Sequence, residues 1–150
     1  MHTILFTKEG YENLKAEQEK LILNRVDAVI DLSKARAMGD LSENGYYRAA
    51  KFKLSDIDRT LRHLKRLIKD GKISTPTHHE TVGFGTSVTI HDGKKNQTYM
   101  IVGEYEANPS LGKISHVSPL GKSLMGKKQK EVTSFQTPSG TSQFTIVSIL

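Results

Sequence analysis

The sequence contains no cysteine and no tryptophan, and only 7% of its residues are aromatic. The absence of cysteine excludes disulfide frameworks, thiolate zinc sites, iron–sulfur clusters and cysteine nucleophiles together. No apolar run approaches the roughly 20 residues of a membrane-spanning helix, and the amino terminus becomes charged too early for a signal peptide. We therefore expect a cytoplasmic protein with no membrane association.

The length of 150 residues fits one ordinary domain or two small ones and excludes a large multidomain enzyme. Apolar residues make up 36% of the chain and charged residues 25%, which is the balance of a folded globular protein. The net charge of +6 favours contact with phosphate-rich or acidic surfaces, although many proteins without such partners carry a similar charge.

Proline divides the chain into two halves. All four prolines follow residue 75, and residues 8–74 are rich in helix formers. The polar stretch 74–80 is typical of a linker. We therefore expect a helical domain over residues 1–75 and a second domain over residues 76–150, which are rich in β-branched runs.

Apolar residues recur in the first half at alternating spacings of three and four, which predicts two helices that pack along one stripe each. The first helix is expected to begin with Thr7 as N-cap and to end near Met38, with polar interruptions at Gln18 and Arg25. Its stripe contains Tyr11, Leu14, Leu21, Ala28, Leu32 and Ala35, and the stripe of the second helix contains Tyr47, Ala50, Leu54, Ile57, Leu61, Leu64 and Ile68.

The connection over residues 39–42 is so short that the two helices must fold back antiparallel on each other. About 30 residues per arm give a rod of roughly 45 Å. This rod is longer than a compact domain of this mass needs, so most of it is expected to project into solvent.

The second half shows the pattern of short strands. Runs at 86–91 and 97–102 flank an Asp92-Gly93 turn, which predicts a β-hairpin. Further strands are expected at 113–116, 132–135 and 143–149, with one short helix over 119–125. The predicted fold class is therefore α+β, with a small antiparallel sheet and one helix that covers it.

Asp40 and Glu43 lie at the predicted tip of the helical hairpin. One interpretation is helix capping, in which Asp40 accepts from backbone N–H groups and Glu43 reaches back to the cap, after Gly39 ends the first helix in a left-handed conformation. The other interpretation is that two carboxylates at a projecting end offer oxygen ligands to Mg²⁺. Two carboxylates alone hold Mg²⁺ poorly, so a second macromolecule would have to supply further ligands. The two interpretations do not exclude each other.

Basic residues form an arc on one flank of the second helix, which we call the basic arc. It is either a solvated outer face or a track for nucleic-acid phosphates. Its members are Arg48, Lys51, Arg59, Arg62, Lys65, Arg66 and Lys69.

Three ordered motifs make the chain similar to the bacterial Gre-type transcript cleavage factors, a family of transcription elongation factors, over almost its whole length. The tip motif is Ala35-Arg36-x-x-Gly39-Asp40-Leu41-x-Glu43-Asn44-x-x-Tyr47-x-x-Ala50. The other two are Ile101-Val102-Gly103-x-x-Glu106-Ala107-Asn108-Pro109 and Ser118-Pro119-Leu120-Gly121-Lys122-Ser123-Leu124-Met125-Gly126-Lys127.

The resemblance implies an amino-terminal antiparallel coiled coil and a carboxy-terminal domain of FKBP-like fold. It further implies a factor that is not itself an enzyme. The globular domain would dock on RNA polymerase, and the coiled coil would enter the secondary channel. There its tip would stimulate the polymerase's own Mg²⁺-dependent cleavage of the 3′ end of backtracked nascent RNA, which rescues arrested complexes.

The resemblance also assigns roles to individual residues. Asp40 and Glu43 would be the catalytic carboxylates and would share Mg²⁺ with the polymerase, with no metal held stably by the factor alone. The remaining expected sites are tip support by Gly39, Leu41, Asn44 and Tyr47, RNA binding by Arg48, Lys51, Arg59 and Arg62, and polymerase docking by Ser118, Pro119, Leu120 and Gly121. We expect the factor to act as a monomer.

The chain departs from the family pattern at two sites. Ser42 occupies a tip position that is often basic, and Gln129-Lys130 replaces a usual Gly-Asp pair.

Three other functions stay open. The alternatives are a channel-binding inhibitor of the polymerase, a helical-hairpin adaptor that binds nucleic acid, and a peptidyl-prolyl isomerase. Retention of both tip acids argues against the inhibitor, and fold alone does not establish isomerase activity.

Overall fold

The computed structural model describes residues 3–39, 44–76 and 79–150. The chain divides into two compact units. The globular unit contains residues 1–11 and 71–150, and the hairpin unit contains residues 12–70. Within the described residues, no helix is long and apolar enough to cross a membrane.

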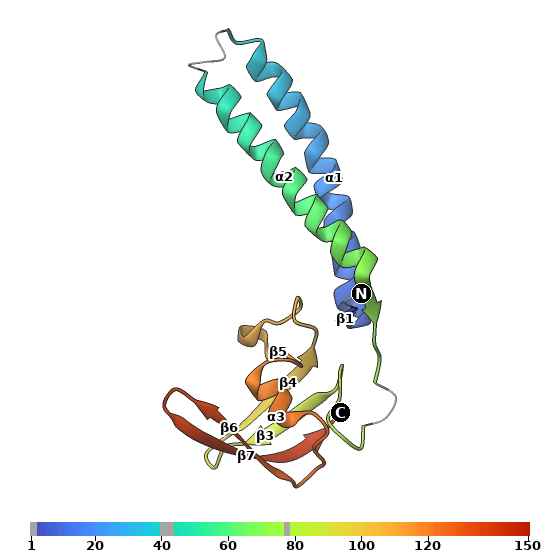
Figure 1. Ribbon diagram of the computed structural model, residues 1–150, viewed down its shortest axis with the longest axis vertical. Coiled ribbons are helices and arrows are strands. Elements are labelled where there is room, and N and C mark those ends of the chain that lie inside the picture. Colours follow the sequence, from blue (N-terminus) through green and yellow to red (C-terminus); the bar gives the residue numbers. More distant parts are fainter. Residues whose placement is uncertain (1–2, 40–43, 77–78) are drawn as a thin grey trace. The chain divides into compact units, whose positions relative to one another are not determined.

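The hairpin unit is built from α1 (Lys8–Arg36), from Glu12 onward, and α2 (Gly45–Asp70), which run side by side in opposite directions (Figure 1). The predicted antiparallel helical hairpin is therefore confirmed. Thr7 caps α1 as expected, because its Oγ1 accepts a hydrogen bond of 3.1 Å from the backbone N–H of Gly10.

The predicted apolar stripes are withdrawn from solvent. All seven stripe positions of α2 are buried or half-buried, and Ala28 and Ala35 are the buried stripe residues of α1. Leu67 of α2 is also buried, although it lies outside the predicted stripe. Burial of these side chains supplies most of the stability of the hairpin, since helix propensity alone is weak.

A salt bridge explains the polar interruption at Arg25. Its guanidinium donates to both carboxylate oxygens of Asp58 on α2, with Nε–Oδ1 at 2.6 Å and Nη2–Oδ2 at 3.4 Å. The hydrogen bond from Arg25 holds the pKa of the Asp58 carboxyl below its ordinary value, and the same contact raises the pKa of Arg25. The pair therefore links the two arms where apolar packing is interrupted.

The amino terminus forms a strand that the sequence analysis did not predict. β1 (Ile4–Phe6) pairs in parallel with β2 (Gly71–Ile73), in the register Ile4↔Gly71. Phe6 is fully buried, and its ring lies 6.0 Å from that of Tyr11 and 6.4 Å from that of Tyr105. The strand is therefore anchored by an aromatic cluster as well as by backbone pairing.

Glu106 fastens the start of α1 to the sheet within the globular unit. Its Oε2 accepts hydrogen bonds from the backbone N–H groups of Thr7 at 2.8 Å and Gly103 at 3.3 Å, and its Oε1 accepts from the Thr7 hydroxyl. Gly103 must lack a side chain, since a Cβ there would lie 2.0 Å from the carbonyl oxygen of Leu5. Gly103 and Glu106 of the motif over residues 101–109 are thus explained by the way the sheet holds β1 and the start of α1.

The rest of the globular unit is a five-stranded sheet in the order β5-β4-β3-β7-β6 (Figure 1). The strands are β3 (Ser87–His91), β4 (Asn96–Val102), β5 (Lys113–Ser115), β6 (Val132–Thr137) and β7 (Gly140–Ile149). The β3–β4 and β6–β7 hairpins are antiparallel as predicted. However, β5 pairs in parallel with β4, because the connection between them contains the 3-10 turn η1 (Pro109–Leu111) and crosses back. The sheet is therefore mixed rather than wholly antiparallel.

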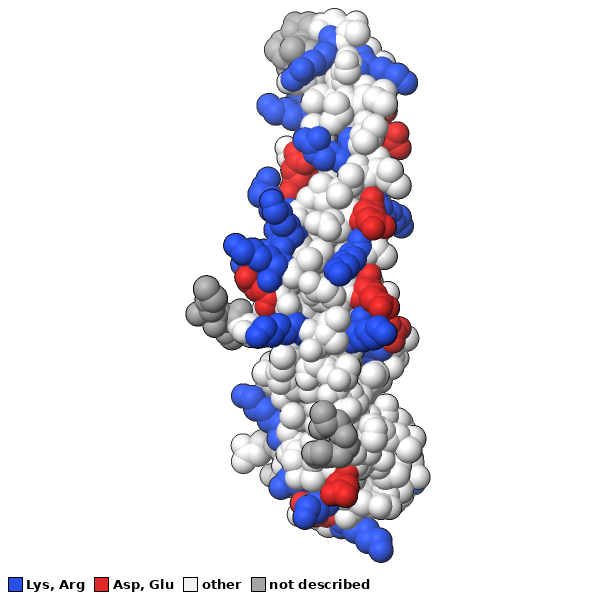
Figure 2. All heavy atoms as spheres, turned by 90° about the vertical axis from the view of Figure 1, so that its right-hand side faces the viewer, with Lys and Arg blue, Asp and Glu red and all other residues white. Residues whose placement is uncertain are grey.

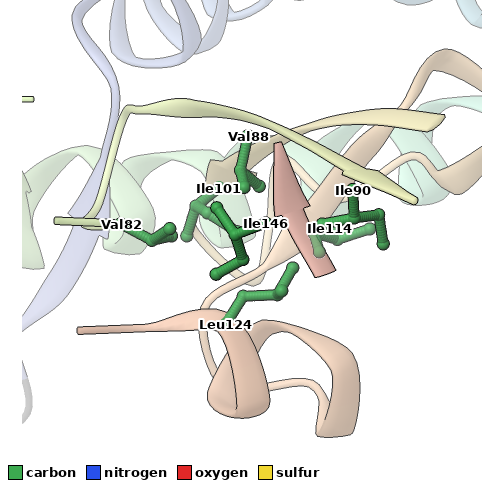
Figure 3. Close-up of a cluster of buried hydrophobic side chains, with 7 residues drawn as sticks. All are labelled: Val82, Val88, Ile90, Ile101, Ile114, Leu124 and Ile146. Atoms are coloured by element: carbon green, nitrogen blue, oxygen red, sulfur yellow. The ribbon is translucent and has the colours of Figure 1, made fainter. Parts of the chain in front are cut away.

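The core of the globular unit lies between this sheet and α3 (Pro119–Leu124), which forms within the predicted range. Figure 3 shows Leu124 of α3 pointing toward Ile146, with Ile101 and Val88 beyond it. The backbone N–H of Gly121 donates to Ser118 Oγ at 3.0 Å, so Ser118 caps this short helix. These contacts fix α3 and the loop before it.

Candidate functional site

Asn44 organises the described part of the hairpin tip. Its Oδ1 accepts a hydrogen bond of 3.0 Å from the backbone N–H of Tyr47, so Asn44 is the N-cap of α2. Its Nδ2 donates at 2.7 Å to the carbonyl oxygen of Ala35, in the last turn of α1. One side chain therefore starts the second arm and ties it to the end of the first.

This arrangement changes the interpretation of the tip acids. Because Asn44 occupies the N-cap of α2, the proposed capping of that helix by Asp40 and Glu43 loses its main support. Asp40, Leu41, Ser42 and Glu43 themselves lie outside the described residues. On their carboxy-terminal side the chain is held by the two hydrogen bonds of Asn44.

Gly39 and Tyr47 lie on the two sides of residues 40–43 along the chain. Gly39 has a φ of 121°, a backbone conformation that residues with a Cβ rarely adopt, and it follows the end of α1 as predicted. The ring of Tyr47 lies under the guanidinium of Arg36, 5.9 Å from ring centroid to Cζ. This contact joins the two arms beside the Asn44 hydrogen bond.

The basic arc lies on the solvent side of α2. All seven of its residues are exposed, and Figure 2 shows Lys and Arg side chains gathered along one edge of the hairpin. Arg59 makes an ion pair of 2.7 Å with Asp56, and both side chains are exposed. Such a surface pair holds its charges weakly, so Arg59 stays available to a phosphate.

Phe52 is an aromatic residue that the sequence analysis did not single out. It is 71% exposed, so its ring is open to solvent. At 100° per residue it lies about 40° around the helix from Arg48 and about 20° from Arg59. An exposed aromatic ring therefore lies at the edge of the basic arc, about 20° beyond Arg59. The sequence signal for it is an apolar residue outside the predicted stripe.

An apolar pocket of about 440 Å³ opens in the globular unit. Three of the four expected docking residues line it, namely Ser118, Pro119 and Leu120, together with the aromatic rings of Tyr99 and Phe135. The two rings come from separate strands, so the sequence did not reveal their proximity.

Gly121, the fourth expected docking residue, does not line this pocket and is buried. A Cβ there would lie 2.0 Å from the carbonyl oxygen of Ser115. The structure therefore gives Gly121 a packing role against Ser115, a residue that lines the pocket.

Comparisons with known proteins cover both units. The family model "Transcription elongation factor, N-terminal" matches residues 4–73, and "Transcription elongation factor, GreA/GreB, C-term" matches residues 77–150. Transcription elongation factor GreA of Pelobacter propionicus is 38% identical over 153 residues, which cover 99% of this chain and 97% of that protein. The GreA of Novosphingobium aromaticivorans is 40% identical over 144 residues, which cover 94% and 91%. The solved GreA factor homolog 1 of Thermus thermophilus is 27% identical, covers 99% of both chains and gives a TM-score of 0.48.

Proposed function

The chain belongs to the GreA/GreB family of transcription elongation factors, and from this premise we propose that it stimulates cleavage of backtracked RNA by RNA polymerase. In this proposal the globular unit docks on the polymerase and the hairpin enters the secondary channel. The bacterial cytoplasm, where transcription takes place, is then its site of action. The observation that carries the proposal is the pair of hydrogen bonds by which the side chain of Asn44 joins the two arms, directly after Glu43 in the sequence.

Asp40 and Glu43 would supply carboxylate oxygens, and the polymerase would supply the remaining ligands for Mg²⁺ together with the RNA phosphate. When bound, the metal would polarise the phosphate and lower the pKa of an attacking water. The contribution of this chain would be positioning, since two carboxylates brought to the polymerase on one chain would remove part of the entropic cost of assembling the site. The factor would therefore assist a reaction whose catalyst is the polymerase.

The basic arc would guide the single-stranded 3′ segment of the RNA. Its exposed cations suit successive phosphates, and the exposed ring of Phe52 suits stacking by an unpaired base. A duplex hides its base faces, so the combination of cations with an aromatic ring favours single-stranded RNA.

The apolar pocket would receive the polymerase. Ser118, Pro119 and Leu120 line it together with the rings of Tyr99 and Phe135. A pocket of this size and character accepts one or two projecting apolar side chains of a protein partner.

The test is RNA length in a stalled, backtracked bacterial elongation complex with Mg²⁺. The native protein should shorten the RNA, and Asp40→Ala and Glu43→Ala should lose this effect while they still bind the polymerase. Asp31→Ala is the matched control, because Asp31 is an exposed acid of the same helical arm outside the tip motif.

The other outcomes separate the alternatives. Slower elongation without cleavage would replace the proposal with a channel-binding inhibitor. Salt-dependent binding to naked RNA without polymerase binding would replace it with a nucleic-acid adaptor.

A further inference from the structure

Helix α1 carries apolar side chains on two faces. One face contains the stripe with buried Ala28 and Ala35. The second, which we call the aliphatic stripe, is exposed to between 41% and 69% per residue and contains Ile22, Leu23, Val26, Val29 and Ile30. At 100° per residue, these five side chains fall within an arc of about 120° whose centre lies roughly 160° from Ala28. The aliphatic stripe therefore points away from α2.

A helix face that meets only water is normally polar. The aliphatic stripe is about 12 Å long and exposes on the order of 400 Å². A patch of about 400 Å² matches the largest apolar patch of a typical monomer, and such a patch is often functional. The packing of the hairpin does not account for it, since the buried stripe already joins the two arms.

The spacing of the aliphatic stripe is the same in both chain directions. Val26 lies at its centre, Leu23 and Val29 stand three residues away on either side, and Ile22 and Ile30 stand four residues away. A two-fold interface needs a surface that is complementary to itself, in which each residue meets its counterpart across the axis. With Val26 on the axis, an antiparallel pair brings Ile22 of one copy opposite Ile30 of the other.

The charges that flank the aliphatic stripe select this direction. Glu19 precedes it and Lys34 follows it, and both are exposed on the same side of α1. In an antiparallel pair centred on Val26, Glu19 of one copy stands opposite residue 33 of the other. Its offset from Lys34 of that copy is therefore one residue, or about 1.5 Å along the helix axis. A parallel pair would set like charges opposite each other, which is unfavourable.

We propose that the aliphatic stripe binds the aliphatic stripe of a second copy of this chain, as an antiparallel two-fold dimer of hairpins. The area per partner is about half of the roughly 800 Å² of a standard interface, so the dimer is weak and reversible. Its dissociation constant is expected in the range of about 10 to 100 μM. The factor is then a monomer only at low concentration, which revises the expectation from the sequence.

The first experiment is sedimentation velocity of the full chain between about 5 and 500 μM, a range that brackets the expected dissociation constant. The native protein should shift from monomer to dimer. Val26→Lys should stay monomeric, because it places two like charges on the two-fold axis. Leu111→Lys is the matched control, since Leu111 is an apolar residue of the globular unit with 70% exposure, and it should dimerise as the native protein does.

Charge reversal tests the direction without changing the aliphatic stripe. Glu19→Lys and Lys34→Glu should each weaken the dimer several-fold, and the double variant should restore it. Circular dichroism at low concentration checks that each variant keeps its helices. Val26→Lys is expected to keep them, because lysine has a higher helix propensity than valine.

Cross-linking tests the register directly, because the native chain has no cysteine. A mixture of Ile22→Cys and Ile30→Cys should form a mixed disulfide under mild oxidation, whereas Ile22→Cys alone should form little. Efficient Ile22→Cys homodimers would indicate a parallel pair and overturn the proposal.

A native protein that stays monomeric throughout the concentration range would also overturn the proposal. If, in addition, Val26→Lys weakened polymerase binding, the aliphatic stripe would belong to the polymerase interface instead. None of these measurements depends on transcript cleavage, so the dimer and the proposed function can fail separately.

Discussion

Replacement of Asn44 by alanine should destabilise the hairpin, because it removes both hydrogen bonds of the Asn44 side chain. Loss of an N-cap costs about 1 kcal/mol, and loss of the bond from Nδ2 to the Ala35 carbonyl oxygen costs about 1 kcal/mol more. The sum of about 2 kcal/mol corresponds to a decrease in Tm of roughly 4 to 8 °C for a chain of this size.

Serine at the same position separates the two contributions. Asn44→Ser keeps an oxygen that can cap α2 but removes the donor that reaches Ala35. Its loss of stability should therefore be about half that of Asn44→Ala. If the joined arms hold the tip in place, Asn44→Ser should also lower transcript cleavage at temperatures where it is fully folded.

The assay is thermal unfolding followed by circular dichroism at 222 nm. This signal reports mainly on the hairpin, since α1 and α2 contain 29 and 26 residues and α3 contains six. Amide hydrogen exchange of the Tyr47 N–H provides a local readout of the cap. An Asn44→Ala variant within about 0.3 kcal/mol of the native protein would refute the reasoning, and so would an Asn44→Ser variant as unstable as Asn44→Ala.

Three further predictions use single positions and thermal or chemical unfolding. Lys130 has a φ of 74° and is exposed, so Lys130→Gly should stabilise the protein by up to about 1 kcal/mol, and a loss of stability would contradict this account. Gly121→Ala should cost about 2 kcal/mol or more, because its Cβ would meet the Ser115 carbonyl oxygen, whereas Gly45→Ala has open space and should cost nothing. The pKa of Asp58 is lowered in the folded state, so its contribution to stability is present above about pH 4 and is lost as the pH falls through the folded pKa. The free energy of unfolding of Asp58→Asn should therefore fall less than that of the native protein between about pH 5 and pH 2. If the two proteins lost the same free energy of unfolding over this range, the explanation would be wrong.

Local patterns predicted the elements whose signals lie close together in the sequence. The three-and-four spacing of the α2 stripe identified residues that are indeed withdrawn from solvent, since that spacing follows directly from helix geometry. The Asp92-Gly93 turn likewise predicted the β3–β4 hairpin, in which Asp92 Oδ1 accepts from the backbone N–H groups of Lys94 and Lys95.

Features that depend on distant parts of the chain escaped prediction. Strand β1 has three residues, too few for a periodic signal, and its partner begins only at Gly71. The parallel pairing of β5 with β4 follows from a crossover that no local pattern encodes. At the tip, the Asp-x-x-Glu pattern that begins at Asp40 favoured an earlier helix start, so the N-cap at Asn44 was not predicted.

The pairing of β1 with β2 has a consequence for how members of this architecture can diverge. The chain leaves the globular unit after Tyr11, in the first turn of α1, and returns to it at β2, so the hairpin unit is an insertion between two adjacent strands. Equal numbers of heptads can be added to or removed from the two arms, at about 10 Å per heptad, without any change in the register of either sheet. Arm length and the docking surface are therefore free to evolve independently, and hairpins from related proteins can be exchanged at residues 11 and 71.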